Sequence, residues 1–163
     1  MTKLSLEMQQ EMARRLGNQG YLTENQVNGF KTRGNKGMLG EMEFVKSKGI
    51  KTTFDNKQGA DFIINGIKVQ FKYMGYESNP SATETKKHPD ESNEQFVDRI
   101  VDVKYKEVDE FWIYLDDDFE FNDDRIIKLN KNQFTKLLLT QNIKDNKKIR
   151  ITRRAKVELF RYQ

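Results

Sequence analysis

The sequence predicts a mixed α/β (α+β) domain, in which helices flank a central sheet and extra helices precede it. Apolar residues recur at helical spacing through the first fifty residues. The segment 61–72 instead alternates apolar and polar residues around an Asn-Gly pair, as a strand hairpin does. Later, a short apolar segment of strand length is followed by a helical pattern. Helices and strands mixed in this order pack as layers around one core.

The N-terminal region predicts two helices and a basic loop. Residues 3–16 form an amphipathic pattern that two glycines end, and Thr23 begins a capping-box spacing that predicts a short second helix. Residues 31–37 contain basic side chains and glycines, which indicate a mobile loop. We therefore expect residues 1–30 to be a helical extension and residues 31–163 to be the main domain.

Residues 37–49 predict a helix that ends at a glycine and carries two acids. Rotation by about 100° per residue places one apolar arc on it, made of Met38, Met42 and Val45. Glu41 lies in or beside this arc, whereas Glu43 lies on the solvated side. A carboxylate at an apolar face needs a partner, so Glu41 is the better candidate for function. The alternative is that Glu41 pairs with a lysine on the helix surface.

The Asn65-Gly66 pair predicts a two-residue hairpin turn and so fixes the register of the strands around it. One face is then apolar and consists of Phe62, Ile64, Ile67, Val69 and Phe71. The other face holds Asp61, Ile63, Lys68, Gln70 and Lys72. Directly opposed residues have Cβ atoms about 5 Å apart, so Asp61 and Gln70 are close enough to bind one ion.

The rest of the chain alternates loops with short regular elements. We expect a loop over 78–94, a helical or extended segment over 95–107, a buried strand over 110–115, an acidic turn over 116–118, a helix over 131–142 and a final strand or hairpin over 148–162.

Charge is distributed unevenly along the chain. The net charge is only +4, but residues 86–124 hold five basic and fourteen acidic side chains, and residues 125–163 hold twelve basic and two acidic ones. A segment as basic as the second suits a polyanion such as nucleic acid. The alternative is that it pairs with the acidic stretch before it.

Cysteine is absent, which excludes disulfides, thiolate zinc sites and cysteine nucleophiles. The first residues include acids and lack the uninterrupted apolar region of a signal peptide, and no apolar run approaches the length of a membrane span. We therefore expect a soluble, cytoplasmic protein that does not bind a membrane.

The polar face of the hairpin suits phosphodiester hydrolysis with Mg²⁺, for which Mn²⁺ would substitute. Magnesium prefers hard oxygen ligands, and one or two carboxylates with water and phosphate are enough. Asp61 offers a carboxylate, Gln70 a side-chain carbonyl and Phe71 a backbone carbonyl, while Glu41 would bind a second ion directly or through water. Lys72 would orient or deprotonate the attacking water, or counter the transition-state charge.

Three motifs in this region, KGMLGE at 36–41, GAD at 59–61 and VQFK at 69–72, resemble those of the PD-(D/E)xK nuclease superfamily. The first two are most similar to those of archaeal-type Holliday junction resolvases. The resemblance covers about residues 34–73. It implies a restriction-endonuclease-like mixed sheet flanked by helices, a divalent-metal-dependent endodeoxyribonuclease activity, and a catalytic set of Glu41, Asp61, Gln70 and Lys72.

One residue departs from the superfamily pattern, because Gln70 stands where a glutamate is usual. Some members, among them a cyanobacterial intron homing endonuclease, similarly use Q-x-K and remain active. A junction resolvase and a homing or restriction-type enzyme are therefore the two enzyme classes that the resemblance implies. The alternative is a non-catalytic DNA-binding module with a decayed nuclease site.

DNA is the expected partner, bound by a homodimer or a higher homo-oligomer. The basic residues that flank the motifs or lie in the basic C-terminal segment are candidates for phosphate contacts, namely Arg33, Lys36, Lys57, Arg150, Arg153 and Arg154. A composition rich in lysine and asparagine also suits a phage or an AT-rich genome.

Overall fold

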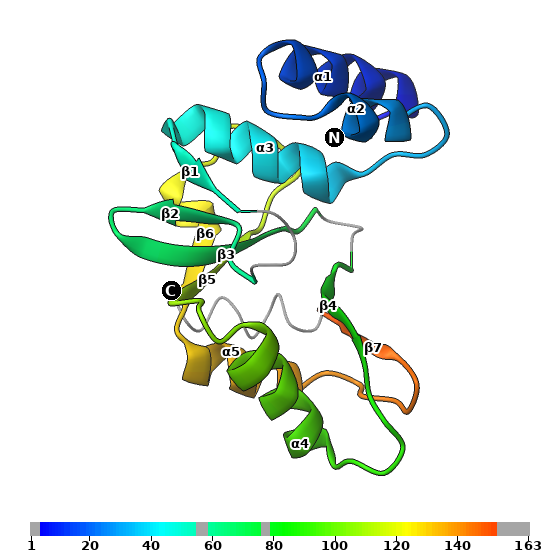
Figure 1. Ribbon diagram of the computed structural model, residues 1–163, viewed down its shortest axis with the longest axis vertical. Helices are drawn as coiled ribbons and strands as arrows, with labels where there is room; N and C mark the ends of the chain where they lie inside the picture. Colours follow the sequence, from blue (N-terminus) through cyan, green and yellow to red (C-terminus); the bar gives the residue numbers. More distant parts are fainter. Residues whose placement is uncertain (1–3, 55–58, 76–78, 153–163) are drawn as a thin grey trace. The chain divides into compact units, whose positions relative to one another are not determined.

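A computed structural model describes residues 4–54, 59–75 and 79–152 (Figure 1). The chain divides into two compact units, Met1–Ile50 and Lys51–Gln163. Helices and a mixed sheet are both present, so the predicted α+β class is confirmed. The first unit contains all three N-terminal helices. The expected division into an extension over residues 1–30 and a main domain over residues 31–163 stays a prediction. No helix among the described residues is both long and apolar enough to cross a membrane.

The N-terminal unit consists of α1 (Leu6–Asn18), α2 (Glu24–Gly29) and α3 (Lys36–Lys48). Their shared core is made of Ala13, Leu16, Leu22, Phe30 and Leu39. The predicted capping box is present, because Thr23 accepts a hydrogen bond from the backbone of Gln26 and the Gln26 side chain accepts one in return. Gly49 ends α3 in the left-handed conformation with a φ of 63°, as the glycine there predicts.

Five strands of the second unit form the main sheet, in the order β1-β2-β3-β5-β6. Their bounds are Thr52–Thr53, Phe62–Ile64, Ile67–Tyr73, Glu110–Tyr114 and Ile126–Leu129. Strands β3 and β5 are parallel, and the other pairs are antiparallel. A separate two-stranded sheet pairs β4 (Ser81–Lys86) with β7 (Lys148–Arg150).

The β2–β3 hairpin has the predicted turn and register. Phe62 pairs with Val69 and Ile64 pairs with Ile67. Both turn residues have positive φ angles, 51° at Asn65 and 78° at Gly66, as a type I′ turn requires. The sequence pattern thus predicted the face on which each hairpin side chain lies.

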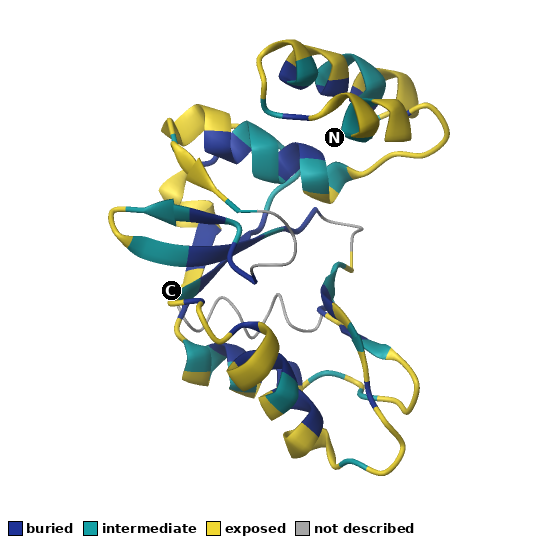
Figure 2. Ribbon diagram, viewed as in Figure 1, coloured by how far each residue is buried: buried dark blue, intermediate teal, exposed yellow. Residues whose placement is uncertain are grey.

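The core of the second unit lies between the main sheet and three helical segments, α4 (Asn93–Asp98), the π-helix η1 (Arg99–Lys104) and α5 (Lys131–Leu139). Figure 2 shows the buried positions of α4 and α5 along one side of each helix. At the centre, the rings of Phe111 and Phe134 stack with centroids 4.0 Å apart. Such stacking adds to the stabilisation from apolar burial.

Polar residues of β3 share this helix-covered face. Gln70 pairs with Phe111 of β5, and Lys72 pairs with Ile113. Paired residues on neighbouring strands point to the same side of a sheet. The face therefore changes from an apolar core over β5 to a polar surface over β3.

Two sequence-based expectations need correction. The polar segment 78–94 contains strand β4 rather than a continuous loop, because Ser81–Lys86 finds a partner strand far along the chain in β7. Strand β6 was not predicted at all. Residues 95–107 were expected to be helical or extended, and they are mainly helical. Of the expected final strand, 148–150 is β7, and residues 153–162 lie outside the described part of the chain.

Candidate functional site

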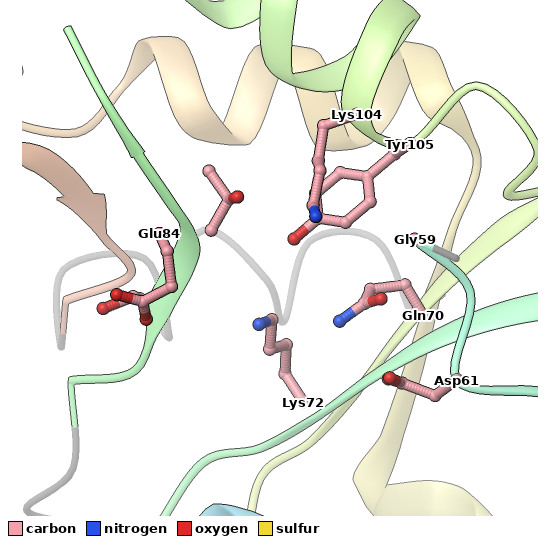
Figure 3. A pocket seen from close by; sticks show the side chains of 9 residues that line it. Gly59, Asp61, Gln70, Lys72, Glu84, Lys104 and Tyr105 are labelled. Carbon is pink, nitrogen blue, oxygen red and sulfur yellow. The ribbon is translucent and has the colours of Figure 1, made fainter. Parts of the chain in front are cut away.

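A cavity of about 280 Å³ opens where the polar face of β3 meets the end of η1 and strand β4 (Figure 3). All of its lining residues belong to the second unit: Gly59, Asp61, Gln70, Lys72, Ser81, Thr83, Glu84, Lys104 and Tyr105. Three of the four predicted catalytic residues, Asp61, Gln70 and Lys72, therefore line one cavity.

The Asp61 carboxylate is held by the backbone of the neighbouring strand. Its Oδ2 atom accepts a hydrogen bond from the Phe71 backbone N–H at 2.7 Å. The backbone N–H of Asp61 in turn donates to the Val69 carbonyl at 2.7 Å. These two bonds fix both the main chain and the carboxylate of a half-buried acid at the mouth of the hairpin.

Gln70 is a buried polar residue, only 7% exposed. Its carboxamide points into the cavity (Figure 3), and within the described residues it has no hydrogen-bond partner. The carboxamide faces the open cavity, so solvent or a ligand that enters there can reach its oxygen and nitrogen atoms.

Lys72 lies two residues beyond Gln70 and therefore on the same face of β3. Its side chain is half-buried, and its amino group is directed into the cavity (Figure 3). An ammonium group is thus placed beside a carboxylate and a carboxamide that are both suited to hold a hard cation.

Tyr105 connects strand β4 to strand β5 beside the cavity. Its hydroxyl group donates a hydrogen bond to the carbonyl of Ala82 on β4, and its ring packs edge-on against Phe111 with centroids 5.5 Å apart. Burial of the ring, together with the carboxylates of Asp61 and Glu84, raises the pKa of Tyr105 to about 12. The phenol therefore stays neutral at physiological pH and does not act as a base.

Gly59, the first residue of the GAD motif, allows the hairpin to approach η1. Its φ is +81°, and a Cβ atom there would lie 2.7 Å from the carbonyl oxygen of Lys104. Both the backbone conformation and the close approach therefore require glycine. The motif glycine thus has a structural role at the cavity, in addition to preceding Asp61.

We expect Gly59→Ala to destabilise the protein by about 3 kcal/mol, through left-handed strain and the clash with Lys104. The matched control is Gly66→Ala, because Gly66 has a φ of +78° but no atom within 4 Å of the added methyl group. Strain alone should cost about 1 kcal/mol there. Urea unfolding of both variants measures the difference, and equal losses would contradict a tight contact at residue 59.

The other predicted catalytic residue, Glu41, lies on α3 of the N-terminal unit. It is half-buried, and so is Glu43, so burial does not distinguish the two acids. The participation of Glu41 in the site stays a prediction.

The predicted DNA-binding residues lie in several places. Arg33 is exposed and lines a second cavity of about 310 Å³ in the N-terminal unit, and Lys36 is the first residue of α3. Arg150 is exposed on β7, where its guanidinium donates to the Asn79 carbonyl at 3.0 Å. The three others, Lys57, Arg153 and Arg154, are outside the described residues.

Sequence reasoning missed one whole wall of the cavity, formed by Ser81, Thr83, Glu84, Lys104 and Tyr105. The only signal in the sequence was the segment SATETK, in which threonines favour a strand. Its proximity to the hairpin depends on contacts between distant segments, which local patterns do not encode.

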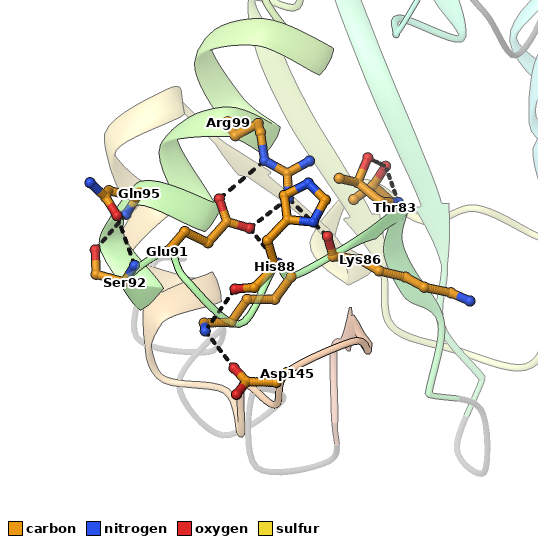
Figure 4. Close-up of polar contacts among 10 residues, drawn as sticks. Thr83, Lys86, His88, Glu91, Ser92, Gln95, Arg99 and Asp145 are labelled. Carbon is orange, nitrogen blue, oxygen red and sulfur yellow. Dashed lines mark hydrogen bonds and ion pairs between the residues drawn. The ribbon is translucent and has the colours of Figure 1, made fainter.

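Two ion pairs anchor β4 to its surroundings just beyond the cavity (Figure 4). Lys87, only 6% exposed, donates to Asp145 Oδ1 at 2.6 Å and to the His88 carbonyl. Arg99 of η1 binds Glu91 at 2.6 Å and also donates to the Lys86 carbonyl at 2.8 Å. The turn after β4 is thereby fastened to both η1 and the segment that precedes β7.

The Arg99 contact predicts a pH-dependent contribution to stability. It lowers the pKa of Glu91 from 4.5 to about 2. A depressed acid pKa stabilises the fold above pH 4.5, and the contribution disappears as pH falls from 4.5 towards 2. We expect Glu91→Gln to lower the melting temperature at pH 7 and to lose most of this effect by pH 2.5. Glu94→Gln, at an exposed acid in the first turn of α4, is the control. A pH-independent effect of Glu91→Gln would contradict the ion-pair explanation.

Comparisons with protein-family models, with curated proteins and with solved structures found no match to this chain. Within the described residues, no group of three or more histidine, cysteine, aspartate or glutamate side chains is arranged to hold a metal ion. A site with one or two carboxylates remains compatible with magnesium, which keeps several of its waters. The donors on β2–β3 fit such an ion, because Asp61 and the unpartnered Gln70 carboxamide present hard oxygen atoms to one cavity.

Proposed function

We propose that this protein is a divalent-metal-dependent endodeoxyribonuclease, which hydrolyses DNA phosphodiester bonds as a Holliday junction resolvase-like or a homing or restriction-type enzyme. The observation that carries the proposal is the position of Gln70, a residue only 7% exposed, whose carboxamide faces the cavity that Asp61 and Lys72 also line. The motif resemblance over residues 36–72 independently supports the same three side chains.

Asp61 and Gln70 would hold Mg²⁺ or Mn²⁺, with the Phe71 carbonyl as a further oxygen ligand. The bound ion supplies positive charge that stabilises the negative charge developing on the phosphate. The hydrogen bond from the Phe71 N–H keeps the Asp61 carboxylate in place without an added ligand. As an ammonium group, Lys72 would orient the attacking water or counter charge in the transition state, and only as a neutral amine would it deprotonate that water.

A non-catalytic DNA-binding module is the second candidate, and the identity of residue 70 favours it. A glutamine instead of a carboxylate removes one negative charge from the proposed ion site, which weakens its attraction for a divalent cation. In that case the cavity would bind a phosphate of DNA and perform no chemistry.

Cleavage of a DNA panel tests the proposal. Supercoiled plasmid, linear duplex, single strand and a four-way junction are incubated with the protein and with Mg²⁺, with Mn²⁺ or with EDTA. We expect metal-dependent cleavage that EDTA abolishes. DNA binding without cleavage of the panel, or of a library of longer duplex sites, would support the binding module.

The preferred substrate distinguishes the two enzyme classes. A resolvase should act as a symmetric dimer on four-way junctions, with little dependence on sequence. A homing or restriction-type enzyme should cut duplex at one site that it recognises through base contacts. Sedimentation velocity at the concentration of the cleavage assay determines whether the active species is the proposed homo-oligomer.

A further inference from the structure

We propose that Lys104, at the end of η1, binds a backbone phosphate of the substrate across the cavity from Lys72. This inference rests on the proposed function and deepens it, because it assigns a substrate contact to a residue outside the motifs. The two lysines come from different walls of one cavity. Figure 3 shows the amino groups of both directed towards its interior.

The main chain of Lys104 is held rigidly although its side chain is exposed. Its carbonyl oxygen faces Gly59 in a contact too close for any Cβ atom. The next residue, Tyr105, is 3% exposed, and its hydroxyl group and backbone N–H donate to Ala82 and Ile100 respectively. The fixed backbone confines the amino group of Lys104 to the reach of its four-carbon side chain beside the cavity.

The charges on the lining favour an anion next to Lys104. The cavity lining contains two lysines, Lys72 and Lys104, and two acids, Asp61 and Glu84. Glu84 already pairs with Lys148 at 3.0 Å, and no acid in the described part of the chain forms an ion pair with Lys104. The amino group of Lys104 is therefore available for a phosphate oxygen.

The neighbouring groups provide hydrogen bonds of the kind that a phosphodiester uses. Ser81 and Thr83 of β4 line the same wall and add hydroxyl groups. Hydroxyl and ammonium donors together are typical of contacts to the DNA backbone, which position a strand without reading its sequence. The wall formed by β4 and η1 would thus bind the DNA strand, while the residues of the hairpin wall would promote hydrolysis of its phosphodiester bond.

The test compares Lys104→Ala with Lys106→Ala, which removes the same charge from an exposed neighbour that does not line the cavity. Binding of a fluorescent DNA to each variant is measured by anisotropy in EDTA over a series of salt concentrations. We expect Lys104→Ala to weaken binding about tenfold and to lower the salt slope by about one, whereas Lys106→Ala leaves the slope unchanged. Lys104→Arg should retain most of the affinity. Equal effects of the two alanine variants would overturn the proposal.

A second measurement separates this proposal from the nuclease function. A thymidine dinucleotide, which carries one phosphodiester, is titrated into the ¹⁵N-labelled protein without metal. We expect shifts at the amides of Thr83 and Lys104 that weaken several-fold in Lys104→Ala. If these shifts occur and no DNA is cleaved, the phosphate site stands and the nuclease function fails. If DNA is cleaved but the shifts lie elsewhere, the nuclease function stands and the Lys104 site fails.

Discussion

Lys72→Ala should reduce the rate of DNA cleavage about 10³-fold, which corresponds to about 4 kcal/mol of transition-state stabilisation. The reason is the position of its amino group in the same cavity as Asp61 and Gln70. An ammonium group at this point either positions the attacking water or offsets charge on the phosphate. Single-turnover cleavage of the preferred substrate measures the effect, and circular dichroism verifies that the variant is folded.

The matched control for Lys72 is Lys68→Ala, on the same strand and the same face. Lys68 forms an ion pair with Glu107 at 3.6 Å, at the other end of β3, and does not line the cavity. Exposed pairs of this kind contribute little to stability, so the rate should stay within about twofold of wild type. If both variants cleave at the wild-type rate, Lys72 has no catalytic role.

Asp61→Asn should weaken the binding of Mn²⁺ about 100-fold and reduce cleavage by a similar factor or more. The substitution removes one negative charge from the ion site, where the other side-chain donor, Gln70, is already neutral. The side-chain carbonyl of asparagine can still accept the hydrogen bond from Phe71, so the end of the hairpin should keep its structure. Calorimetric titration with Mn²⁺ measures the affinity independently of cleavage.

Asp109→Asn provides an unusually close control for Asp61. The Asp109 carboxylate also accepts a hydrogen bond from the backbone of β3, in this case from the Lys68 N–H at 2.9 Å, but it is not part of the cavity lining. The same change of charge at the same kind of contact should leave Mn²⁺ affinity unaltered. Equal losses in the two variants would indicate a general electrostatic effect and would remove Asp61 from the ion site.

The hairpin half of the site was predictable because its information is local. The Asn65-Gly66 turn determines the register, and alternation then places Gln70 and Lys72 on one face. Their place beside the core follows from the pairing of β3 with β5, which the sequence did not predict. Glu41 differs from these residues, because no turn or strand register links α3 to the hairpin.

The opposite wall was not predictable because it depends on contacts between distant segments. Strand β4 is polar and follows a proline, and its pairing partner lies almost seventy residues later, as the pair Ser81 and Arg150 shows. Lys104 is the last residue of a π-helix, a rare element that produces no simple spacing of apolar residues in the sequence. Neither feature leaves a signature within a short window of sequence.

The separation of the two walls along the chain has a consequence for the order in which the protein folds. The hairpin joins Phe62 to Val69, a contact that closes a short loop, whereas β4 must wait for β7. Long-range strand pairing loses more chain entropy and forms more slowly. During synthesis, we therefore expect Asp61, Gln70 and Lys72 to come together early, and the cavity to form only once Arg150 has left the ribosome. A nascent chain would then carry the three hairpin residues of the candidate site before the opposite wall of the cavity exists.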